Sequence, residues 1–234
     1  PVSTRAFGDA RAGHFRLQSP HIDIGKAFLY SETVGAGNTG EVRFLGGRID
    51  VIGGSIFTKT YAGGNAGSMS FTGDTIRFLG GNGAITFVDT TADGGSSGNG
   101  GAIEVLAGTA FELGRGEFPH DWTRLSTSTF SSGRAGNITV DAPSIDIRDG
   151  ASIWAGAFQS GRGGDISILG ETVSVTGHGR ITSIAEGSGR GGDIDIIASK
   201  RFYTSEILRV PIDEHVFFGT HSYTAGSADA GHIR

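Results

Sequence analysis

The chain has 234 residues, of which 42 are glycine, 5 are proline and none is cysteine. So much glycine with so little proline excludes a collagen helix and a proline-rich disordered tract, and the absence of cysteine excludes stabilisation by disulfides. The formal net charge is −5 and the basic residues are scattered, so a nucleic-acid partner has no electrostatic support. No run reaches the ~18 apolar residues that a membrane-spanning helix needs.

A short motif returns along the chain and marks the start of a repeat. Its clearest copy runs from Arg134 to Val140, and each copy reads polar, small, glycine, any residue, apolar, polar, apolar. The glycines of the successive copies are Gly13, Gly40, Gly67, Gly101, Gly136, Gly164, Gly192 and Gly231. Their spacing of about 27 to 39 residues indicates a solenoid. We expect these glycines at the corners of coils, where the backbone needs a positive φ and a Cβ would clash.

Each repeat predicts three short strands with apolar residues at alternate positions. The first strand follows the glycine directly, and its expected outward residues are Arg16, Arg43, Ser70, Glu104, Thr139, Ser167 and Asp195. The second strand has the apolar pairs Ile22/Ile24, Ile49/Val51, Ile76/Phe78, Ile145/Ile147 and Val173/Val175. The third strand follows a corner, and its expected inward residues are Leu29, Ile56, Ile85, Ile153 and Ile181. Strands this short become stable only when the next repeat extends each of them into a parallel sheet, so the sequence predicts an all-β, three-faced parallel β-helix.

The repeats follow one another without a linker, so we expect a single solenoid of about seven coils over residues 1–234. The predicted coils are 11–37, 38–64, 65–98, 99–133, 134–161, 162–189 and 190–228, with partial coils at 1–10 and 229–234. Coil three adds a polar loop, which we expect from Thr90 to Gly98. The first inward column is predicted to contain Phe15, Leu17, Val42 and Phe44.

Two irregular inserts, at 114–122 in coil four and 207–216 in coil seven, interrupt the strand pattern. They contain His120, Trp122, Asp213 and His215, which form a possible binding surface. Histidine and aspartate are metal ligands, but these coils lie three rises, or roughly 14 Å, apart along the stack. We therefore expect polar surface loops, with no metal site and no cofactor.

The carboxylates Asp23 and Asp50 provide the strongest catalytic alternative. They occupy the same outward position of the second strand in neighbouring coils, and Arg77 follows them. Parallel strands are ~4.8 Å apart, which is close to the ~5 to 5.5 Å between the two carboxyl groups of a retaining glycosidase. A polysaccharide lyase or glycosidase is thus an alternative function. Solvated carboxylates are common on a sheet face, however, and Asp146 occupies the same column further along.

Several aromatic residues do not fall at clear inward positions. They are Tyr30, Phe57, Tyr61, Trp122 and Trp154. Aromatic side chains on a flat sheet face can stack on sugar rings or pack against a neighbouring rod, and both are binding functions. Packing in the core or at a corner is the other interpretation of the same residues.

The stretch from Arg134 to Ala142, followed by Ile145–Ile147, the run Gly150–Ile153 and a Ser-Gly turn at 160–161, resembles the rod repeats of the filamentous haemagglutinin family. These are large exoproteins of two-partner secretion systems. The resemblance covers about residues 11–234. It implies a right-handed parallel β-helix, export through an outer-membrane partner, and adhesive or structural work at the bacterial cell surface.

The leading hypothesis is therefore a secreted structural or adhesive rod that is not an enzyme. An enzyme on this fold is expected to build a cleft from long loops on consecutive coils, whereas the long loops here fall on coils three, four and seven. The stretch Ala230–Arg234 echoes Ala12–Arg16. We expect the segment either to belong to a longer chain or to stack end to end with identical copies, and we expect surface glycans as further partners.

Overall fold

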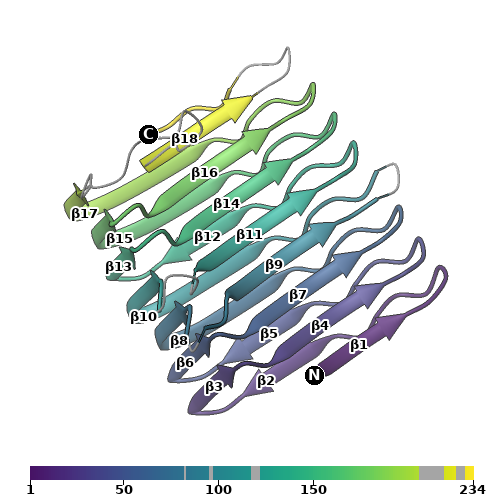
Figure 1. Cartoon of the computed structure of the whole chain (residues 1–234), viewed down its shortest axis with the longest axis horizontal. Helices are drawn as coiled ribbons and strands as arrows, with labels where there is room; N and C mark the ends of the chain where they lie inside the picture. Colours follow the sequence, from purple (N-terminus) through teal and green to yellow (C-terminus); the bar gives the residue numbers. More distant parts are fainter. Residues whose placement is uncertain (82, 95–96, 117–121, 206–218, 225–229) are drawn as a thin grey trace.

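The computed structural model describes residues 1–81, 83–94, 97–116, 122–205, 219–224 and 230–234. Within these residues the regular elements are strands, and no helix occurs that could cross a membrane. The coils stack from the purple N-terminal coil to the yellow C-terminal one and form a solenoid of about seven turns (Figure 1). The prediction of an all-β parallel β-helix is confirmed.

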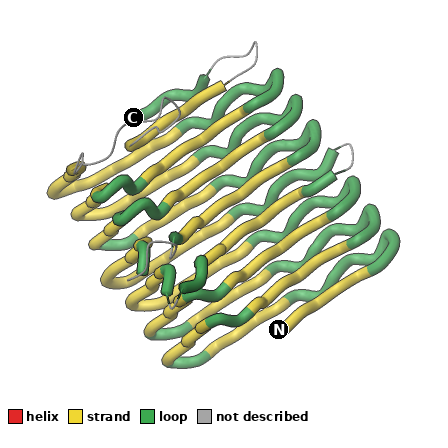
Figure 2. The backbone as a smooth tube through the Cα atoms, in the orientation of Figure 1, coloured by secondary structure: helices red, strands yellow, loops and turns green. Residues whose placement is uncertain are grey.

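Each coil contributes one strand to a first sheet. In stacking order this sheet contains β1 (Val2–Ala6), β4 (Phe28–Thr33), β7 (Ser55–Thr60), β9 (Thr86–Ala92), β11 (Thr123–Thr129), β14 (Ser152–Ala157), β16 (Arg180–Ala185) and β18 (Gly219–Thr224). Neighbouring strands pair in parallel, with Leu29 beside Ile56 and Ile153 beside Ile181. The tube view shows these strands in yellow, joined by green loops (Figure 2).

The remaining strands form a second sheet with two rows. The short strands of the first row are β2 (Phe15–Gln18), β5 (Val42–Leu45) and β12 (Ile138–Asp141). Those of the second row are β3 (His21–Gly25), β6 (Arg48–Ile52) and β13 (Ser144–Ile147). Four long strands run through both rows: β8 (Met69–Leu79), β10 (Ile103–Gly114), β15 (Ile166–Thr176) and β17 (Ile194–Ser205).

The long strands differ from the prediction of three short strands in every coil. In coils three, four, six and seven the first two predicted strands are continuous, because the chain turns that corner without leaving the sheet. Register shifts in β10 between Ala107 and Ala110 and in β15 between Gly170 and Thr172 mark such corners. An irregularity of this kind bends a strand while keeping most of its hydrogen bonds.

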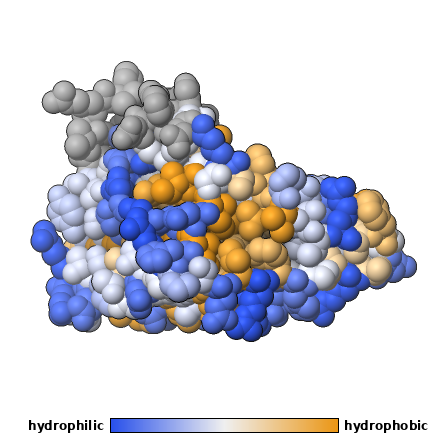
Figure 3. Space-filling model, turned by 90° about the horizontal axis from the view of Figure 1, so that it is seen from below, coloured by the Kyte–Doolittle hydropathy of each residue, from blue (hydrophilic) through white to orange (hydrophobic). Residues whose placement is uncertain are grey.

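The core is a continuous column of inward side chains. The rings of Phe44 and Phe71 stack with centroids 4.9 Å apart, and Phe78 and Phe111 continue the contact edge to face. These four side chains are fully buried. Seen from below Figure 1, where the N-terminal coil lies, apolar side chains gather in the middle of a polar surround (Figure 3). The predicted inward column at Val42 and Phe44 is confirmed.

The prediction for coil three is wrong by a few residues. Ile85 was expected to point inward, but it precedes β9 and is half-buried, and Val88 takes the inward position beside Ile56. The reason is a longer corner, in which Gly81 and Ala84 pair with each other before the strand begins. The expected loop from Thr90 to Gly98 also starts later, since Thr90 lies within β9 and is buried.

The repeat glycines stack on one another at the start of successive coils. A Cβ on Gly40 would overlap the carbonyl oxygen of Gly13, and the same contact recurs up the column from Gly101 to Gly136. The expected positive φ is wrong for these glycines: among the described residues, the glycines with positive φ are Gly8, Gly53, Gly83, Gly94, Gly150 and Gly177. The close approach of two backbones, rather than a left-handed conformation, therefore explains the motif.

Buried polar side chains form hydrogen bonds with the repeat glycines at the corner that begins each coil. Thr58 and Thr127 each point inward from the first sheet and donate a hydrogen bond of 2.6 Å to the carbonyl oxygens of Gly67 and Gly136. Both threonine side chains are fully buried. The end of one coil is thereby tied to the start of the next, and the buried hydroxyl groups are satisfied.

Candidate functional site

The structure places Asp23 and Asp50 side by side, with Arg77 on the next strand, as the sequence predicts. The Asp50 side chain is only 5% exposed and accepts hydrogen bonds from Arg48 Nε at 2.7 Å and Arg77 Nε at 2.8 Å. Burial alone would raise the pKa of the Asp50 carboxyl, but the hydrogen bonds from Arg77 and Arg48 outweigh burial and hold that pKa below its ordinary value.

This environment bears on the catalytic alternative. A general acid needs a raised pKa, whereas Asp50 is held ionised by two arginines. The same pattern returns further along the column, where Arg148 forms ion pairs with Asp146 and Glu112. Ion-paired carboxylates thus recur on this face, and the geometry around Asp50 favours a structural ion pair over an acid–base pair.

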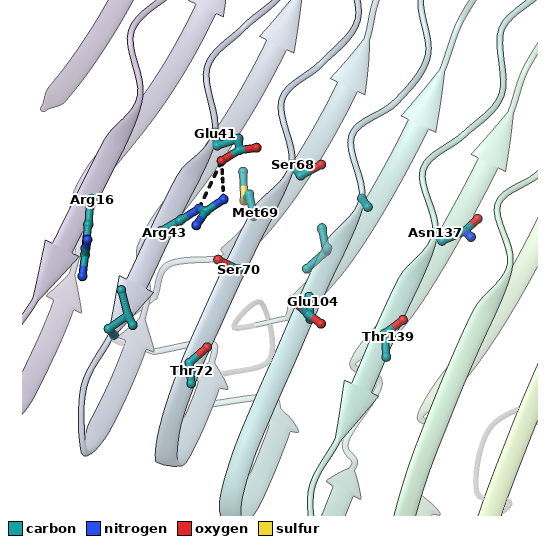
Figure 4. Close-up of a pocket in the computed structure, with 13 residues that line it drawn as sticks. Arg16, Glu41, Arg43, Ser68, Met69, Ser70, Thr72, Glu104, Asn137 and Thr139 are labelled. Atoms are coloured by element: carbon teal, nitrogen blue, oxygen red, sulfur yellow. Dashed lines mark hydrogen bonds and ion pairs between the residues drawn. The ribbon is translucent and has the colours of Figure 1, made fainter.

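A shallow groove of about 590 Å³ lies over the first row of the second sheet (Figure 4). The predicted outward column lines it, in the register order Arg16, Arg43, Ser70, Glu104 and Thr139. Within it Glu41 accepts hydrogen bonds from Arg43 at 2.6 and 3.1 Å. Glu104 lies between Ser70 and Thr139, so among the described residues this column brings no two carboxylates together.

Metal binding receives no support from the part of the chain that the structure describes, because no group of three metal-ligating side chains occurs there. Of the possible binding surface, Trp122 is described and half-buried. His120, Asp213 and His215 lie outside the described residues. The structure therefore places only Trp122 of this predicted set.

The outer side of the first sheet carries a band of aromatic side chains, here called the aromatic face. It consists of Tyr30, Phe57, Phe87, Trp122, Phe130, Trp154 and Phe158. Phe57 lies 6.2 Å from Phe87, and Phe87 meets Trp122 edge to face at 5.0 Å. Phe130 stacks on Phe158 at 4.3 Å. The aromatic face thus extends across neighbouring coils on a rigid parallel sheet.

Sequence reasoning found only part of this face. Tyr30, Phe57, Trp122 and Trp154 were singled out as aromatic residues without a clear inward position. Phe87 was missed because the expected inward position of Ile85 implied the opposite orientation for this strand. Phe130 and Phe158 follow the ends of β11 and β14, where strand alternation no longer predicts a direction. Each of these two phenylalanines directly follows the same strand of its coil, and this repetition in neighbouring coils was the signal available in the sequence.

Glycine shapes the aromatic face at Trp154. A Cβ on Gly156, two residues along the same side of β14, would overlap the indole ring. The missing side chain leaves room for the ring to lie over the strand, and its centroid is 5.2 Å from that of Phe158. The indole is therefore held by neighbours on its own coil.

Two charged groups beside the aromatic face already have polar partners within the chain. Asp89 accepts hydrogen bonds from Thr91 and from Ser126, the latter at 2.6 Å, while burial raises the pKa of its carboxyl. Lys59 forms an ion pair of 2.8 Å with Asp93. Burial alone would lower the pKa of Lys59, but the hydrogen bond to Asp93 outweighs it and the pKa is raised.

Comparisons with protein-family models, with curated proteins and with solved structures gave no match. The stacked coils and the geometry of their faces are thus the basis on which a function can be argued.

Proposed function

We propose that this protein is a structural and adhesive rod of the bacterial cell surface, and that it binds its targets through the outer faces of its coils without chemical change. The aromatic face is the observation that carries this proposal. Rings such as Phe57, Phe87 and Trp154 are half-exposed on a sheet that backbone hydrogen bonds hold rigid. Apolar surface that is presented in this way favours recognition of a partner.

The environment of the acidic pair supports adhesion over catalysis. Hydrolysis of a glycosidic bond requires one carboxyl group that donates a proton and a second that attacks the sugar or activates water. The lowered pKa of Asp50 does not suit the first role, and its side chain, 5% exposed and ion-paired to Arg48 and Arg77, does not suit the second. A polysaccharide lyase or glycosidase therefore remains the second candidate, supported only by the adjacency of Asp23 and Asp50 in the register.

The resemblance of the repeats to filamentous haemagglutinin rods supports export and a surface location, with an outer-membrane protein as the secretion partner. The proposal also includes adjoining repeats or identical copies as partners along the axis of the rod. Val2 of the first strand is 54% exposed, and apolar side chains show in the middle of the view from below (Figure 3). Another coil of the same shape would cover such a surface.

One experiment separates the two candidate functions. The purified protein is passed over immobilised bacterial and host glycans, and retention is measured together with the release of reducing ends or unsaturated sugars. We expect retention without product. Release of product that Asp23→Asn abolishes would establish the enzyme instead, and neither retention nor product would remove adhesion to glycans from the proposal.

A further inference from the structure

Arg124 lies at the centre of the aromatic face. It points outward from β11, with Phe87 of β9 and Ser152 of β14 as its register neighbours. Its guanidinium carbon is 5.2 Å from the ring centroid of Trp122, 5.6 Å from that of Trp154 and 5.9 Å from that of Phe87. The guanidinium group is thus surrounded by three aromatic rings from three different coils.

The charge of Arg124 is not neutralised within the described part of the chain. Elsewhere arginines such as Arg77 and Arg148 lie within ion-pair distance of carboxylates, but no described carboxylate lies within that distance of Arg124. Its Nε atom is buried and has no hydrogen-bond partner in the part of the chain that the structure describes. The nearby carboxylate of Asp89 instead accepts hydrogen bonds from Thr91 and Ser126.

The electrostatics of Arg124 are those of a cation that has no ion-pair partner among the described residues. Burial lowers the pKa of its guanidinium, the charge of Asp89 opposes that effect, and the positive charge of Arg180 adds to it. A half-enclosed charge without a partner is unfavourable, and an anionic ligand would offset that cost.

We propose that Arg124 binds the acidic group of a carboxylated or sulfated glycan whose sugar rings lie on Phe87, Trp122 and Trp154. This inference rests on the proposed adhesive function and specifies its ligand. A guanidinium pairs with a planar carboxylate or with a sulfate through two parallel hydrogen bonds, and aromatic rings pack against the apolar faces of sugars.

The surroundings favour a glycan over a nucleic acid. Ser152 beside Arg124 and Thr182 beside Trp154 present half-exposed hydroxyl groups, which suit the many hydroxyls of a sugar chain. The chain as a whole carries a net charge of −5, so binding of a polyanion needs contacts besides charge. An acidic glycan supplies such contacts through the hydroxyl groups and the apolar faces of its sugar rings.

The test measures equilibrium binding of the whole chain to polygalacturonate, heparin, neutral dextran and oligo-dT at several salt concentrations. We expect the two acidic glycans to bind more tightly than dextran and oligo-dT, with an affinity that falls as salt rises. Arg124→Gln should weaken binding to the acidic glycans by about tenfold or more and leave any dextran binding unchanged.

Arg201→Gln is the matched control. Arg201 also lies over an aromatic ring, with its guanidinium carbon 5.1 Å from the centroid of Tyr203, but it is exposed and belongs to the second sheet. We expect this variant to bind the acidic glycans within about twofold of the unmodified chain. Equal losses in Arg124→Gln and Arg201→Gln would show that only net charge matters and would overturn the site.

Thermal unfolding tests whether Arg124 acts only within the fold. Arg124→Gln removes a half-buried charge that has no ion-pair partner among the described residues, but it also removes the contacts with three rings, so we expect the melting temperature to change little. A lower melting temperature with intact glycan binding would assign Arg124 a structural role and overturn the proposal. Should Arg124→Gln fail to fold, Arg124→Lys keeps the charge without the planar group, and unaltered binding by that folded variant would also overturn it.

The remaining outcomes separate this inference from the proposed function. Tighter binding to oligo-dT than to either acidic glycan would overturn the acidic-glycan site in favour of a nucleic acid. Binding to dextran and the acidic glycans with equal affinity would overturn the site but keep adhesion. Depolymerisation of polygalacturonate or heparin during the measurement would contradict the adhesive function itself.

Discussion

At the corner that begins each coil, the space for a side chain is smaller than a methyl group. The Cα atom of one repeat glycine faces the carbonyl oxygen of the glycine below it, as for Gly67 above Gly40. A second column with the same contact lies three residues earlier in the chain, for example at Gly64 above Gly37. Sequence reasoning placed the first column and missed the second, because only the first begins the alternating pattern of a strand.

We expect Gly67→Ala to lower the free energy of unfolding by about 3 kcal/mol, because the added Cβ meets backbone atoms that cannot move aside. Gly63→Ala is the matched control four residues earlier, where a Cβ would have nothing within 4 Å. Its effect should stay within about 1 kcal/mol. Urea denaturation measures the free energy of unfolding of both variants. Similar losses of stability in the two would mean that the corner spacing is not set by backbone contact.

The ion pairs of Asp50 make stability depend on pH. The folded-state pKa of this carboxyl is below its unfolded value of about 3.9, so its contribution is present at higher pH and is lost as pH falls through the folded pKa. Asp50→Asn should lose roughly 1 to 3 kcal/mol at neutral pH, since Arg77 and Arg48 lose their partner. It should also show a shallower loss of stability below about pH 4.

Urea midpoints of the unmodified chain and of Asp50→Asn between neutral and acidic pH measure this effect. Asp141→Asn, a change of an exposed carboxylate on β12, is the control and should keep the pH profile of the unmodified chain. Parallel profiles for all three proteins would contradict a native-state contribution from Asp50.

At the scale of a strand, alternation and stacking fix the direction of each side chain. Ile138 of β12 is fully buried, and Thr139 beside it is half-exposed. We expect Ile138→Asp to destabilise the chain by more than about 4 kcal/mol, because it buries an unpaired charge. Thr139→Asp should cost less than about 1 kcal/mol. Circular dichroism melts compare the two variants, and equal losses would contradict the register.

The sequence predicted strand direction wherever the distance from the repeat glycine is constant. The whole outward column of the first row, from Arg16 to Asp195, was therefore assigned correctly. Assignment failed at Ile85, because a longer corner changes the distance and one register step reverses every side chain. The same error concealed Phe87, which explains why the aromatic face was only partly anticipated.

The charged contacts of the candidate sites could not be predicted from alternation. Asp50 has an outward position, yet Arg48 and Arg77 bury it, because long side chains of neighbouring positions fold over the sheet. Arg124 likewise depends on rings from three coils, and their approach follows from side-chain conformations rather than from spacing. Strand direction is a backbone property, whereas these sites depend on packing between coils.

For the whole molecule, stability comes from contacts between neighbouring coils. Because the described residues provide no group of three metal ligands, we expect EDTA to leave the melting temperature and the β-sheet circular dichroism signal unchanged. Thermal scans with and without the chelator make the measurement. A loss of sheet signal on chelation would reveal a stabilising metal and contradict this expectation.

Because of the two glycine columns, each coil also meets the next through the same backbone contacts, so the rod can be lengthened one coil at a time. Each coil presents a bare Cα on one side and a carbonyl oxygen on the other, and coils five and six repeat this arrangement at Gly136, Gly161, Gly164 and Gly189. A duplicated copy of residues 134–161 would meet the same surfaces above and below, and the rod would lengthen by ~4.8 Å without a new kind of contact. Gene duplication can therefore adjust how far such a molecule extends, while the faces that bind are altered independently.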